Sequence, residues 1–525
     1  MIRGIPAPSG RSPRPAAWLR AGELDVSGIT ADSREVAPGF LFAALPGSAR
    51  DGRTFIAEAV SRGAAAVLAP VGTSWPPGVP PRPLIEDPEP RRRLAQLAAT
   101  LAGRQPTTVV AVTGTNGKTS TVEFLRQIWT LAGEPAASLG TLGLAAPGFD
   151  AGPGLTTPDP VALAETLARL ARAGIEHAAI EASSHGLDQF RLDGVRLAAA
   201  GFTNLTRDHL DYHGTLDAYR AAKLRLFTDL LARGSPAVAS DTADAATLAA
   251  LAEIARRRGL ELRTVGESGS AVRLHRAEPR PDGQEIEIEV EGARHVIPLA
   301  LPGRFQTDNV LLAAALALAT GAHRVLDALP RLAGVRGRME LAARLPNGAA
   351  AYVDYAHTPD ALQRLLLALR PHTAGRLHVV FGAGGDRDRG KRPLMGEIAA
   401  RLADRAIVTD DNPRGENPAA IRAAILAACP GAVEIGDRAR AIEAALGDLA
   451  TGDVLAVAGK GHEQGQTIGG VVVPFDDVGV IRGLVGSPAP LTQPSPARGE
   501  GSSSPSPLAG LSREADQGRG EGSTE

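Results

Sequence analysis

The chain alternates short apolar runs with longer amphipathic segments. In residues 24–101, apolar runs such as GFLFAAL and AAAVLAP are separated by helix-like segments such as RTFIAEAVSRG. A second series begins with TTVVAVTG at residues 107–114 and continues with HAAIEAS, AAAGFTNLT and AVAS. A third begins near residue 334, with AAAYVDYAH, RLHVVFGAG, RAIVTDD and DVLAVAGKG. Strands that alternate with helices predict an α/β fold with a mainly parallel sheet and helices on both of its faces.

Changes in this pattern divide the chain into three folded units and a tail. The predicted domains are 1–103, 104–333 and 334–486, followed by a tail at 487–525. Length alone agrees, because 525 residues correspond to about three domains. The tail is rich in Ser, Pro, Gly and charged residues and has too few apolar residues to offset the entropy of ordering. We predict that it is disordered, either as an inert extension or as a segment that binds a partner.

Composition and charge exclude several classes of function. The 56 Lys and Arg residues nearly balance the 58 Asp and Glu residues, which argues against a nucleic-acid or membrane-surface binder. The single Cys429 excludes an intrachain disulfide and a cysteine zinc site. The longest strongly apolar stretch, residues 310–319, is shorter than the roughly 20 residues that span a bilayer, and the N-terminus lacks a signal-like apolar region. We predict a cytoplasmic protein that meets anionic ligands through local groups.

The segment VVAVTGTNGKTSTVEFLRQI has the pattern of a phosphate-binding loop between a buried strand and a helix. Glycines let the backbone wrap an anion, the start of the helix directs N–H groups at it, and a lysine adds a positive charge. Thr119 is placed to bind Mg2+. A complete G-x-x-x-x-G-K-[ST] motif would have glycine at Val112, so the match is partial. We predict that ATP is bound by Gly114, Thr115, Asn116, Gly117, Lys118, Thr119 and Ser120; the alternative for this segment is an ordinary turn between a strand and a helix.

Three further polar residues in the second unit are candidates for the same site. Glu181 ends a predicted buried strand, where a carboxylate is costly unless it meets a cation such as Mg2+. His209 follows the next apolar run, and Lys223 lies on a predicted helix. Spacing alone leaves a structural histidine and a solvated lysine as open alternatives.

Eight motifs occur in a fixed order along the chain: TGTNGKT, EASSHGL, TNLTRDHLDYHG, GRME, VDYAHTPDAL, GDRDRGKRPLM, DNPRGE and AGKGHE. Together they resemble the Mur ligases of peptidoglycan synthesis, most closely the members that add a diamino acid to UDP-N-acetylmuramoyl-L-alanyl-D-glutamate. The resemblance runs from about residue 32 to residue 485. It implies a three-domain architecture: an N-terminal domain for the UDP end of the substrate, a central P-loop domain with a parallel sheet, and a Rossmann-like C-terminal domain for the incoming amino acid.

The resemblance assigns two groups of residues to the UDP-linked substrate. Positions that contact the UDP-sugar correspond to Ala31, Ser33, Ser48, Ala49 and Arg50. Positions that hold the sugar-peptide correspond to Thr156, Thr157, Ser183, Gln189 and Arg191. Leu155 stands where members of the family can carry an asparagine, so one substrate hydrogen bond is in question.

The resemblance also assigns the catalytic centre. Lys118, Glu181, His209 and Lys223 match its catalytic residues, and Lys223 matches a lysine that CO2 converts to a carbamate, N6-carboxylysine. The carbamate would turn a cation into an anion that helps to bind a second Mg2+. With Glu181 and His209 it would give a two-metal site across the phosphates, with Thr119 as a further metal ligand. Further contacts with ATP are implied for Asn309, Arg338, Asp354 and His357.

The third domain is expected to select the amino acid. In the resembled family a D-N-P-R motif accompanies use of meso-diaminopimelate, whose second carboxylate an arginine can bind in a bidentate manner. The implied amino-acid pocket consists of Arg387, Asp411, Asn412, Pro413, Arg414, Gly459 and Glu463.

The implied activity is ATP-dependent ligation. ATP would phosphorylate the D-glutamate side chain of UDP-N-acetylmuramoyl-L-alanyl-D-glutamate, and the amine of meso-diaminopimelate would displace phosphate. We expect Mg2+ as cofactor, no nucleic-acid partner, no membrane insertion and a monomer. The alternatives are a lysine-adding, folylpolyglutamate-type or other Mur ligase and, from a different class, a P-loop ATPase that couples hydrolysis to conformational change.

Overall fold

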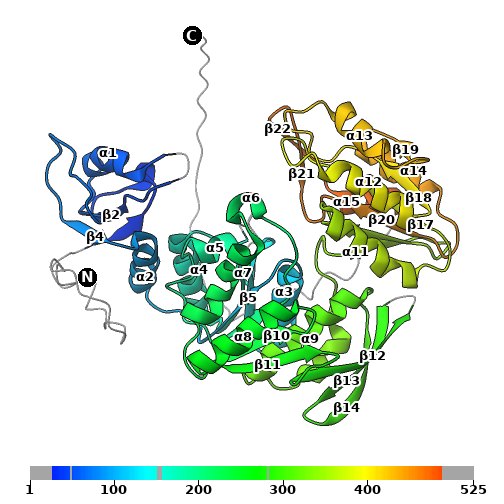
Figure 1. The fold of residues 1–525 in the computed structure, drawn as a ribbon, viewed down its shortest axis with the longest axis horizontal. Helices are drawn as coiled ribbons and strands as arrows, with labels where there is room; N and C mark the ends of the chain where they lie inside the picture. Colours follow the sequence, from blue (N-terminus) through cyan, green and yellow to red (C-terminus); the bar gives the residue numbers. More distant parts are fainter. Residues whose placement is uncertain (1–25, 48–49, 150–155, 281–282, 487–525) are drawn as a thin grey trace, which may run out of the picture. The chain divides into compact units, whose positions relative to one another are not determined.

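The computed structural model of the protein describes residues 26–47, 50–149, 156–280 and 283–486. The predictions made for Ser48, Ala49, Leu155 and the 487–525 tail lie outside the described residues. The described chain forms three main sheets and a separate two-stranded hairpin (Figure 1).

The N-terminal part contains four parallel strands in the order β1-β2-β3-β4. Apolar residues of β2 and β3 are buried on both faces of the sheet, as expected for short parallel strands between helices. Short helical turns occur at Ser33–Glu35 and Gly52–Phe55. The other elements are β1 (Gly28–Thr30), β2 (Phe40–Ala43), α1 (Ile56–Ser61), β3 (Ala66–Pro70), β4 (Leu84–Asp87) and α2 (Pro90–Ala102).

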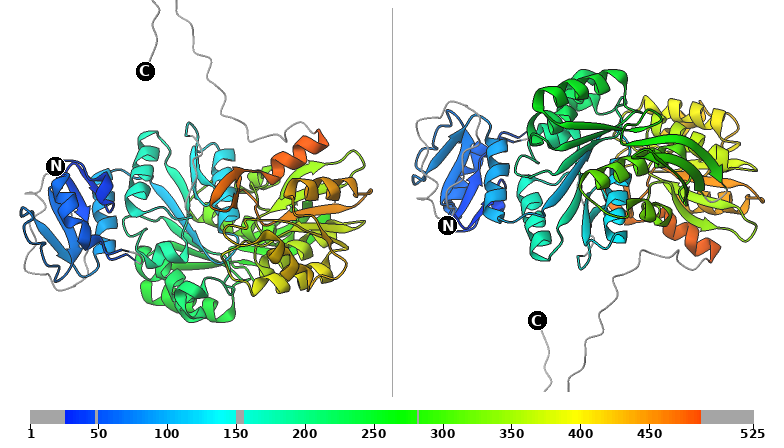
Figure 2. Two further views of the ribbon diagram at one scale, coloured as in Figure 1. Left: turned by 90° about the horizontal axis from the view of Figure 1, so that it is seen from above. Right: turned by 90° about the horizontal axis from the view of Figure 1, so that it is seen from below.

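The central part is built on a ten-stranded sheet in the order β14-β13-β12-β11-β10-β9-β5-β8-β6-β7. One buried cluster joins α3 and α9 to one face, and a second joins α4, α7 and α8 to the other. Figure 2 shows helices on both sides of the strands in this part of the chain. Its elements to the end of the parallel strands are β5 (Thr108–Thr113), α3 (Lys118–Leu131), β6 (Ala136–Gly140), β7 (Gly143–Ala145), α4 (Pro160–Arg172), β8 (His177–Glu181), α5 (Ser184–Asp188), β9 (Ala199–Phe202), α6 (Leu210–His213), α7 (Leu216–Arg225), a π-helical turn (Leu226–Leu230), β10 (Pro236–Ser240), α8 (Ala245–Arg258) and β11 (Glu261–Gly266).

An antiparallel arm extends this sheet beyond β11. Strands β12, β13 and β14 pair antiparallel, and β13 alternates buried and partly buried residues because one of its faces is less covered. The pattern of parallel strands and helices did not indicate this arm, although EIEIEV carries the alternation. The arm and the following helices are β12 (Val272–Arg280), β13 (Gly283–Val290), β14 (Ala293–Leu299), α9 (Arg304–Ala319), α10 (Val325–Ala328) and a short turn (Leu329–Arg331).

The C-terminal part has a six-stranded sheet in the order β15-β16-β20-β17-β18-β19, parallel except for β15. Helices α11, α12 and α13 pack on one face and α14 and α15 on the other. The elements are β15 (Glu340–Arg344), β16 (Ala350–Asp354), α11 (Pro359–Leu369), a short turn (Arg370–His372), β17 (Leu377–Phe381), α12 (Lys391–Leu402), β18 (Arg405–Val408), α13 (Pro418–Leu426), β19 (Val433–Glu434), α14 (Arg438–Gly447), β20 (Val454–Ala458), β21 (Gly465–Ile468), β22 (Val471–Pro474) and α15 (Asp477–Val485).

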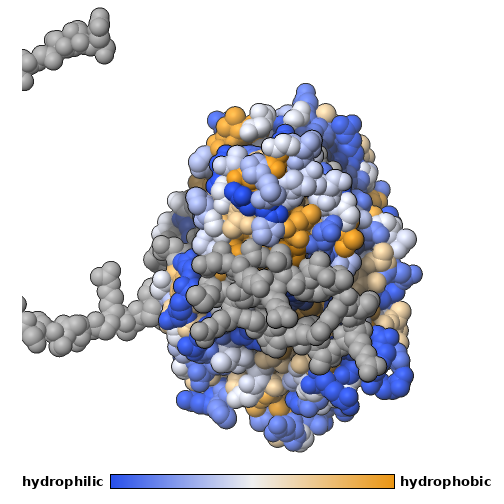
Figure 3. All heavy atoms as spheres, turned by 90° about the vertical axis from the view of Figure 1, so that its left-hand side faces the viewer, coloured by the Kyte–Doolittle hydropathy of each residue, from blue (hydrophilic) through white to orange (hydrophobic). Residues whose placement is uncertain are grey.

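These sheets confirm the predicted α/β class with mainly parallel strands. The domain boundaries given above stay predictions. Within the described residues, no helix has the length and apolarity needed to cross a bilayer. On the face drawn in Figure 3, hydrophilic and hydrophobic residues are interspersed.

Candidate active site

The loop between β5 and α3 has the backbone of an anion-binding turn. Gly114 and Gly117 have φ values of 141° and 85°, which residues with side chains rarely adopt. A Cβ atom on Gly114 would overlap Thr203, and one on Gly117 would overlap Asn309 of α9. Because α3 begins at Lys118, the N–H groups of its first turn have no intrahelical acceptors and are available to an anion.

A residue outside the loop fixes its shape. The backbone oxygen of Asn204 accepts a hydrogen bond from the Thr115 N–H at 2.8 Å. The side-chain Oδ1 of Asn204 accepts one from the Asn116 N–H at 3.0 Å. Asn204 lies just after β9, the neighbour of β5 in the sheet, so the two strand ends build the loop together.

Two lysines converge on one carbonyl group of this loop. Lys118 Nζ donates to the Gly114 oxygen at 2.9 Å and to the Thr115 oxygen at 2.9 Å. Lys223 Nζ, from α7, donates to the same Gly114 oxygen at 2.7 Å. Burial lowers the pKa of Lys118. Burial and then the charge of Lys118 lower the pKa of Lys223 well below its usual value, which favours a neutral amine at that position.

Glu181 is buried at the end of β8, as its sequence position predicts. Its Oε1 accepts a hydrogen bond from the Thr141 N–H at 2.8 Å, and its Oε2 accepts one from the Thr141 hydroxyl at 3.3 Å. A Cβ atom on Gly140 would overlap this carboxylate. The turn after β6 therefore determines the position of Glu181.

His209, unlike Glu181, is not buried. Its side chain is 48% exposed, and its backbone φ is 52° at the start of α6. The ring centroids of His209 and His185 are 5.0 Å apart, and Asp208 lies 3.6 Å from His209 Nε2. In the described ranges, no three His, Cys, Asp or Glu side chains are grouped so as to hold a metal ion.

The donor groups nevertheless fit a hard divalent cation bound together with a nucleotide. Mg2+ prefers oxygen ligands and is commonly held by one or two carboxylates plus substrate phosphates. The Glu181 carboxylate and the Thr119 hydroxyl both line the cavity at the phosphate loop, and His209 lines it as well. These residues would hold Mg2+ on the phosphates of ATP.

Residues of the C-terminal part, at and beside the ends of β15 and β16, line the same cavity, which has a volume of about 600 Å³. Arg338 Nη2 lies 3.5 Å from the Thr119 hydroxyl, and the guanidinium stacks on Tyr355. Burial raises the pKa of Asp354, whose oxygens accept hydrogen bonds from backbone N–H groups. Burial lowers the pKa of His357.

The cavity brings together most of the predicted nucleotide and catalytic residues, but not all of them. The predicted residues that line it are Thr115, Asn116, Gly117, Lys118, Thr119, Ser120, Thr156, Thr157, Glu181, Ser183, Arg191, His209, Lys223, Asn309, Arg338, Asp354 and His357. Gly114 is absent from the lining, although its carbonyl group binds both lysines. Lining residues to which the sequence reasoning gave no role include Thr141, His185, Thr203, Asn204, Asp208, Tyr219 and Asp308.

The residues predicted to hold the sugar-peptide are linked by hydrogen bonds. Thr157 Oγ1 lies 3.0 Å from Ser183 Oγ, and Thr156 Oγ1 lies 3.0 Å from Thr141 Oγ1. Arg191 Nη2 donates to Gln189 Oε1 at 2.8 Å. Gln189 itself does not line the cavity.

The described UDP-sugar candidates lie apart from the cavity lining. Ala31 and Arg50 are exposed on the N-terminal part. Ser33 is buried, and its hydroxyl donates to Glu58 Oε2 at 2.9 Å. A hydrogen bond from the Ser33 hydroxyl to the UDP-sugar would therefore require it to give up its hydrogen bond to Glu58.

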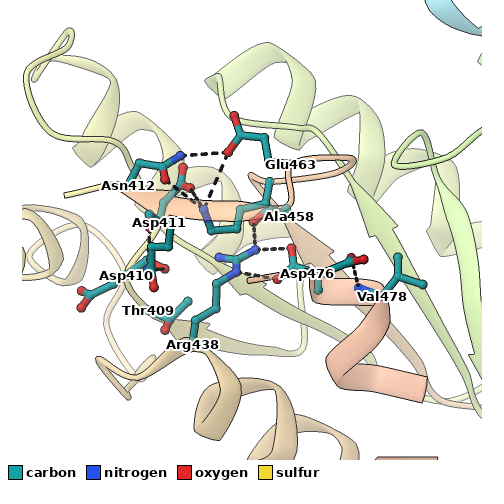
Figure 4. A network of polar contacts seen from close by, with 12 residues as sticks. Thr409, Asp410, Asp411, Asn412, Arg438, Ala458, Glu463, Asp476 and Val478 are labelled. Carbon is teal, nitrogen blue, oxygen red and sulfur yellow. Dashed lines mark hydrogen bonds and ion pairs between the residues drawn. The ribbon is translucent and has the colours of Figure 1, made fainter. Parts of the chain in front are cut away.

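A second polar group forms where β17, β18 and β20 end. These strands are neighbours in a parallel sheet, so the loops that follow them meet at one edge. Asn412 Nδ2 donates to Glu463 Oε2 at 2.9 Å (Figure 4). Gly459 has a φ of 119°, and Arg387 is exposed.

The backbone of Arg414 is held in an uncommon conformation. Its φ is 52°, in the left-handed region that few residues other than glycine adopt. Its N–H donates to the Thr467 oxygen at 3.0 Å, and its oxygen accepts from the Gly469 N–H at 2.8 Å. The guanidinium donates to the Gly385 oxygen at 2.9 Å. The hairpin β21–β22 therefore positions Arg414.

Comparisons with known protein families cover most of the described chain. Residues 25–100 match the catalytic domain of the Mur ligase family. Residues 112–317 match the Mur ligase middle domain, and residues 337–461 match the Mur ligase glutamate ligase domain.

Individual relatives are similar along nearly their whole length. A UDP-N-acetylmuramoyl-L-alanyl-D-glutamate–2,6-diaminopimelate ligase of Caulobacter vibrioides is 57% identical over 461 residues, or 86% of this chain and 94% of that protein. The protein of the same name from Rhizobium meliloti is 55% identical over 470 residues, or 89% of this chain and 95% of that protein. A solved structure of a protein with this name has a TM-score of 0.66 at 34% identity and covers 88% of this chain and 95% of its own. A MurF ligase from Thermotoga maritima in complex with ADP has the same fold, with a TM-score of 0.60 at 19% identity, covering 88% of this chain and 98% of its own.

Proposed function

The chain belongs to the Mur ligase family, and on that premise we propose that it joins meso-2,6-diaminopimelate to UDP-N-acetylmuramoyl-L-alanyl-D-glutamate with the hydrolysis of ATP. The relatives at 57% and 55% identity carry the name of this reaction. A cytoplasmic location follows from the proposal, because ATP and a nucleotide-linked precursor are the substrates. The monomeric state stays a prediction.

The observation that carries the choice of amino acid is the group at the ends of β18 and β20. It contains the carboxylates of Asp411 and Glu463, and Arg414 follows Asp411 in the same loop after β18. Diaminopimelate carries both ammonium and carboxylate groups at the end that does not react. A guanidinium can bind the distal carboxylate with two hydrogen bonds, while the carboxylates of the group can bind the ammonium. Lysine has no distal carboxylate and would leave Arg414 without that partner.

In the first step, the side-chain carboxylate of D-glutamate attacks the γ-phosphorus of ATP, and the bond to the bridging oxygen of ADP breaks. Two anions approach each other, so cations contribute most to catalysis. Lys118 can exchange its loop carbonyl partners for the phosphates, and Arg338 adds a second charge from the opposite wall. Mg2+ bound to the phosphates supplies further charge neutralisation.

In the second step, a neutral amine of the amino acid attacks the carbonyl carbon of the acyl phosphate. The carbon–oxygen bond to phosphate breaks, the nitrogen gives up one proton, and inorganic phosphate leaves carrying that proton as hydrogen phosphate. Enclosing the acyl phosphate between the two walls of the cavity protects it from water. The sequence of steps needs no covalent intermediate with a side chain.

We infer that Lys223 is carbamylated. CO2 adds to a neutral amine, whereas a lysine at its usual pKa is neutral in only about one molecule in 2,500 at pH 7. Burial and the nearby Lys118 lower the pKa of Lys223, and this direction favours the neutral form that CO2 needs. The resulting anion would lie beside Lys118, because both lysines contact the Gly114 oxygen, so the negative charge has a cationic neighbour.

Labelling should test this inference directly. We expect protein equilibrated with 13C-bicarbonate to give a carbamate signal in NMR, and Lys223→Ala to lack it. The same variant should lose most ligase activity, and added bicarbonate should not restore it. Lys391→Arg serves as the control for labelling, because it removes another lysine and should keep the signal. A fully active Lys223→Ala variant would assign Lys223 a structural role.

The overall reaction is tested by omitting one substrate at a time. We expect phosphate release only when ATP, the UDP-linked dipeptide and diaminopimelate are all present, because the acyl phosphate forms on the dipeptide and is consumed by the amine. Phosphate release should be measured together with formation of the tripeptide product. Steady release without an amino acid would favour the P-loop ATPase alternative, and preferential use of lysine or glutamate would favour another ligase of the family.

A further inference from the structure

Lysine is rare in this chain, and its positions are informative. Of the 56 Lys and Arg residues, only Lys118, Lys223, Lys391 and Lys460 are lysines, which leaves 52 arginines. Arginine presents a planar fork, whereas lysine presents a compact point charge with three donors that can point in different directions. Lys118 and Lys223 serve the phosphate loop. Lys460 belongs to the AGKGHE motif but has no role in the reaction described above.

The ammonium of Lys460 is fully buried and lies at the centre of the amino-acid group. Its side chain has 0% exposure. Nζ donates to Asn412 Oδ1 at 3.0 Å and to the Gly465 oxygen at 2.9 Å. It lies 3.6 Å from Asp411 Oδ1 and 3.7 Å from Glu463 Oε2. One buried cation thus touches the loops after β18 and β20 and the start of the β21–β22 hairpin.

These contacts determine the orientation of the Asn412 amide. Its Oδ1 accepts from Lys460 Nζ and from the Thr467 N–H at 2.9 Å, so its Nδ2 must point the other way. There Nδ2 donates to Glu463 Oε2, as Figure 4 shows. Within the part of the chain that the structure describes, Glu463 Oε1 has no hydrogen-bond partner and remains available to an ammonium group.

A second buried cation fixes the strand end from which Lys460 emerges. Arg438 and Asp477 form a fully buried ion pair, with Arg438 Nε at 2.7 Å from Asp477 Oδ1. Arg438 Nη2 also donates to the Ala458 oxygen at 3.0 Å, at the end of β20. Arg438 therefore anchors the end of β20, two residues before Lys460.

The charges of the group also require Lys460. Asp411 and Asn412 are buried, and Asp411 Oδ1 has no hydrogen-bond partner among the described side chains and backbone. Burial lowers the pKa of Lys460, while the carboxylates of Asp411 and Glu463 act in the opposite direction and favour the ammonium form. Without this ammonium, the carboxylates of Asp411 and Glu463 would lose the cation that lies 3.6 Å from the first and 3.7 Å from the second, and Glu463 would lose one of the two contacts that direct it.

We propose that Lys460 is a positioning residue for the incoming amino acid, whose buried ammonium orients Asn412 and Glu463 so that Glu463 Oε1 faces the ammonium of the substrate. The proposal rests on the ligase function proposed above. It concerns binding of the amino acid alone, because Lys460 does not line the cavity of the phosphate loop.

The test measures KM for each of the three substrates separately, in the wild-type protein and in a Lys460 variant. Lys460→Met keeps the length of the side chain and removes its charge. We expect KM for diaminopimelate to rise about 10- to 100-fold, as for the loss of a hydrogen bond to a charged group. The KM values for ATP and the UDP-linked dipeptide, and kcat at saturation, should change by less than about threefold.

A double-mutant cycle with Glu463→Gln shows whether Lys460 acts through Glu463. If it does, adding Lys460→Met to Glu463→Gln should raise KM for diaminopimelate by less than about threefold, because the two residues act as one unit. If KM for diaminopimelate in the double variant rises by the product of the two increases seen in the single variants, the two residues act independently and the proposal is overturned. An unchanged KM for Lys460→Met would overturn it as well.

A matched control distinguishes positioning from loss of stability. His378 and Asp453 form another buried pair in the same sheet, 3.2 Å apart, at the opposite, amino ends of the strands. His378→Leu should lower Tm and leave KM for diaminopimelate unchanged. Failure of Lys460→Met to fold would assign Lys460 to stability and overturn the proposal. The use of diaminopimelate by the wild-type protein is measured first. If the wild-type protein does not use it, the proposed function is wrong, and the variants then say nothing about that function.

Discussion

Replacing Lys118 with methionine should lower kcat for phosphate release by about 100- to 1,000-fold, the loss typical of removing one preorganised charge from a transition state. Lys118 Nζ already lies within the phosphate loop, held by the carbonyl groups of Gly114 and Thr115. Its charge therefore already lies at the loop, and exchanging the two carbonyl partners for phosphate oxygens brings it to the transferred group. The measurement is phosphate release with all three substrates at saturation.

The Lys118 variant should remain folded, because methionine has nearly the same length and the loop glycines are unchanged. Arg256→Met provides a control. Arg256 forms an exposed ion pair with Glu253 on α8, a helix that packs on the same sheet, so this variant should keep the wild-type kcat. Wild-type kcat in Lys118→Met, with an unchanged KM for ATP, would show that the γ-phosphate is transferred elsewhere.

Arg414→Ala should lower kcat/KM for diaminopimelate by at least about 30-fold, equivalent to about 2 kcal/mol, the lower end of the range for truncating one partner of a buried charge pair. The guanidinium is partly buried, and the hairpin β21–β22 fixes its backbone, so a neighbouring side chain cannot readily replace it. Initial rates over a range of diaminopimelate concentrations measure this effect.

The matched control for Arg414 is a change of substrate. L-Lysine lacks the distal carboxylate, so the low rate with lysine should change by less than about threefold between wild type and Arg414→Ala. Arg414→Lys should recover only part of the loss, because an ammonium group cannot form the two parallel hydrogen bonds of a guanidinium. Equal losses for both amino acids would contradict the carboxylate-binding role and indicate a general disturbance of the pocket.

Local patterns were sufficient to predict the buried parallel strands named in the sequence analysis and the turn between β5 and α3. The residues of β5, β8 and β20 form continuous apolar runs because parallel strands between two layers of helices are buried on both faces. The glycines and the lysine of the loop follow β5 directly, so strand, turn and helix could be assigned from neighbouring residues.

Supporting residues were harder to predict, because their roles depend on partners distant in the sequence. Asn204 shapes a loop 88 positions earlier in the chain. Lys460 contacts Asn412 across 48 positions, and its own motif gives no sign of this contact. The arm β12–β14 was missed for another reason: its alternating pattern differs from the buried runs by which the other strands were recognised.

The amino-acid sequence by itself determined the α/β class, the phosphate loop and, through ordered motifs, the family. These features depend on residue types at short spacing, which burial and turn formation dictate locally. Only the tertiary structure decided that Lys118 and Lys223 share the Gly114 oxygen, that Glu181 is held by Thr141, and that Lys460 joins the loops after two strands. The physical reason is that hydrogen bonding and the pKa of a buried group depend on what surrounds it in space, and the order of strands in a sheet sets those surroundings.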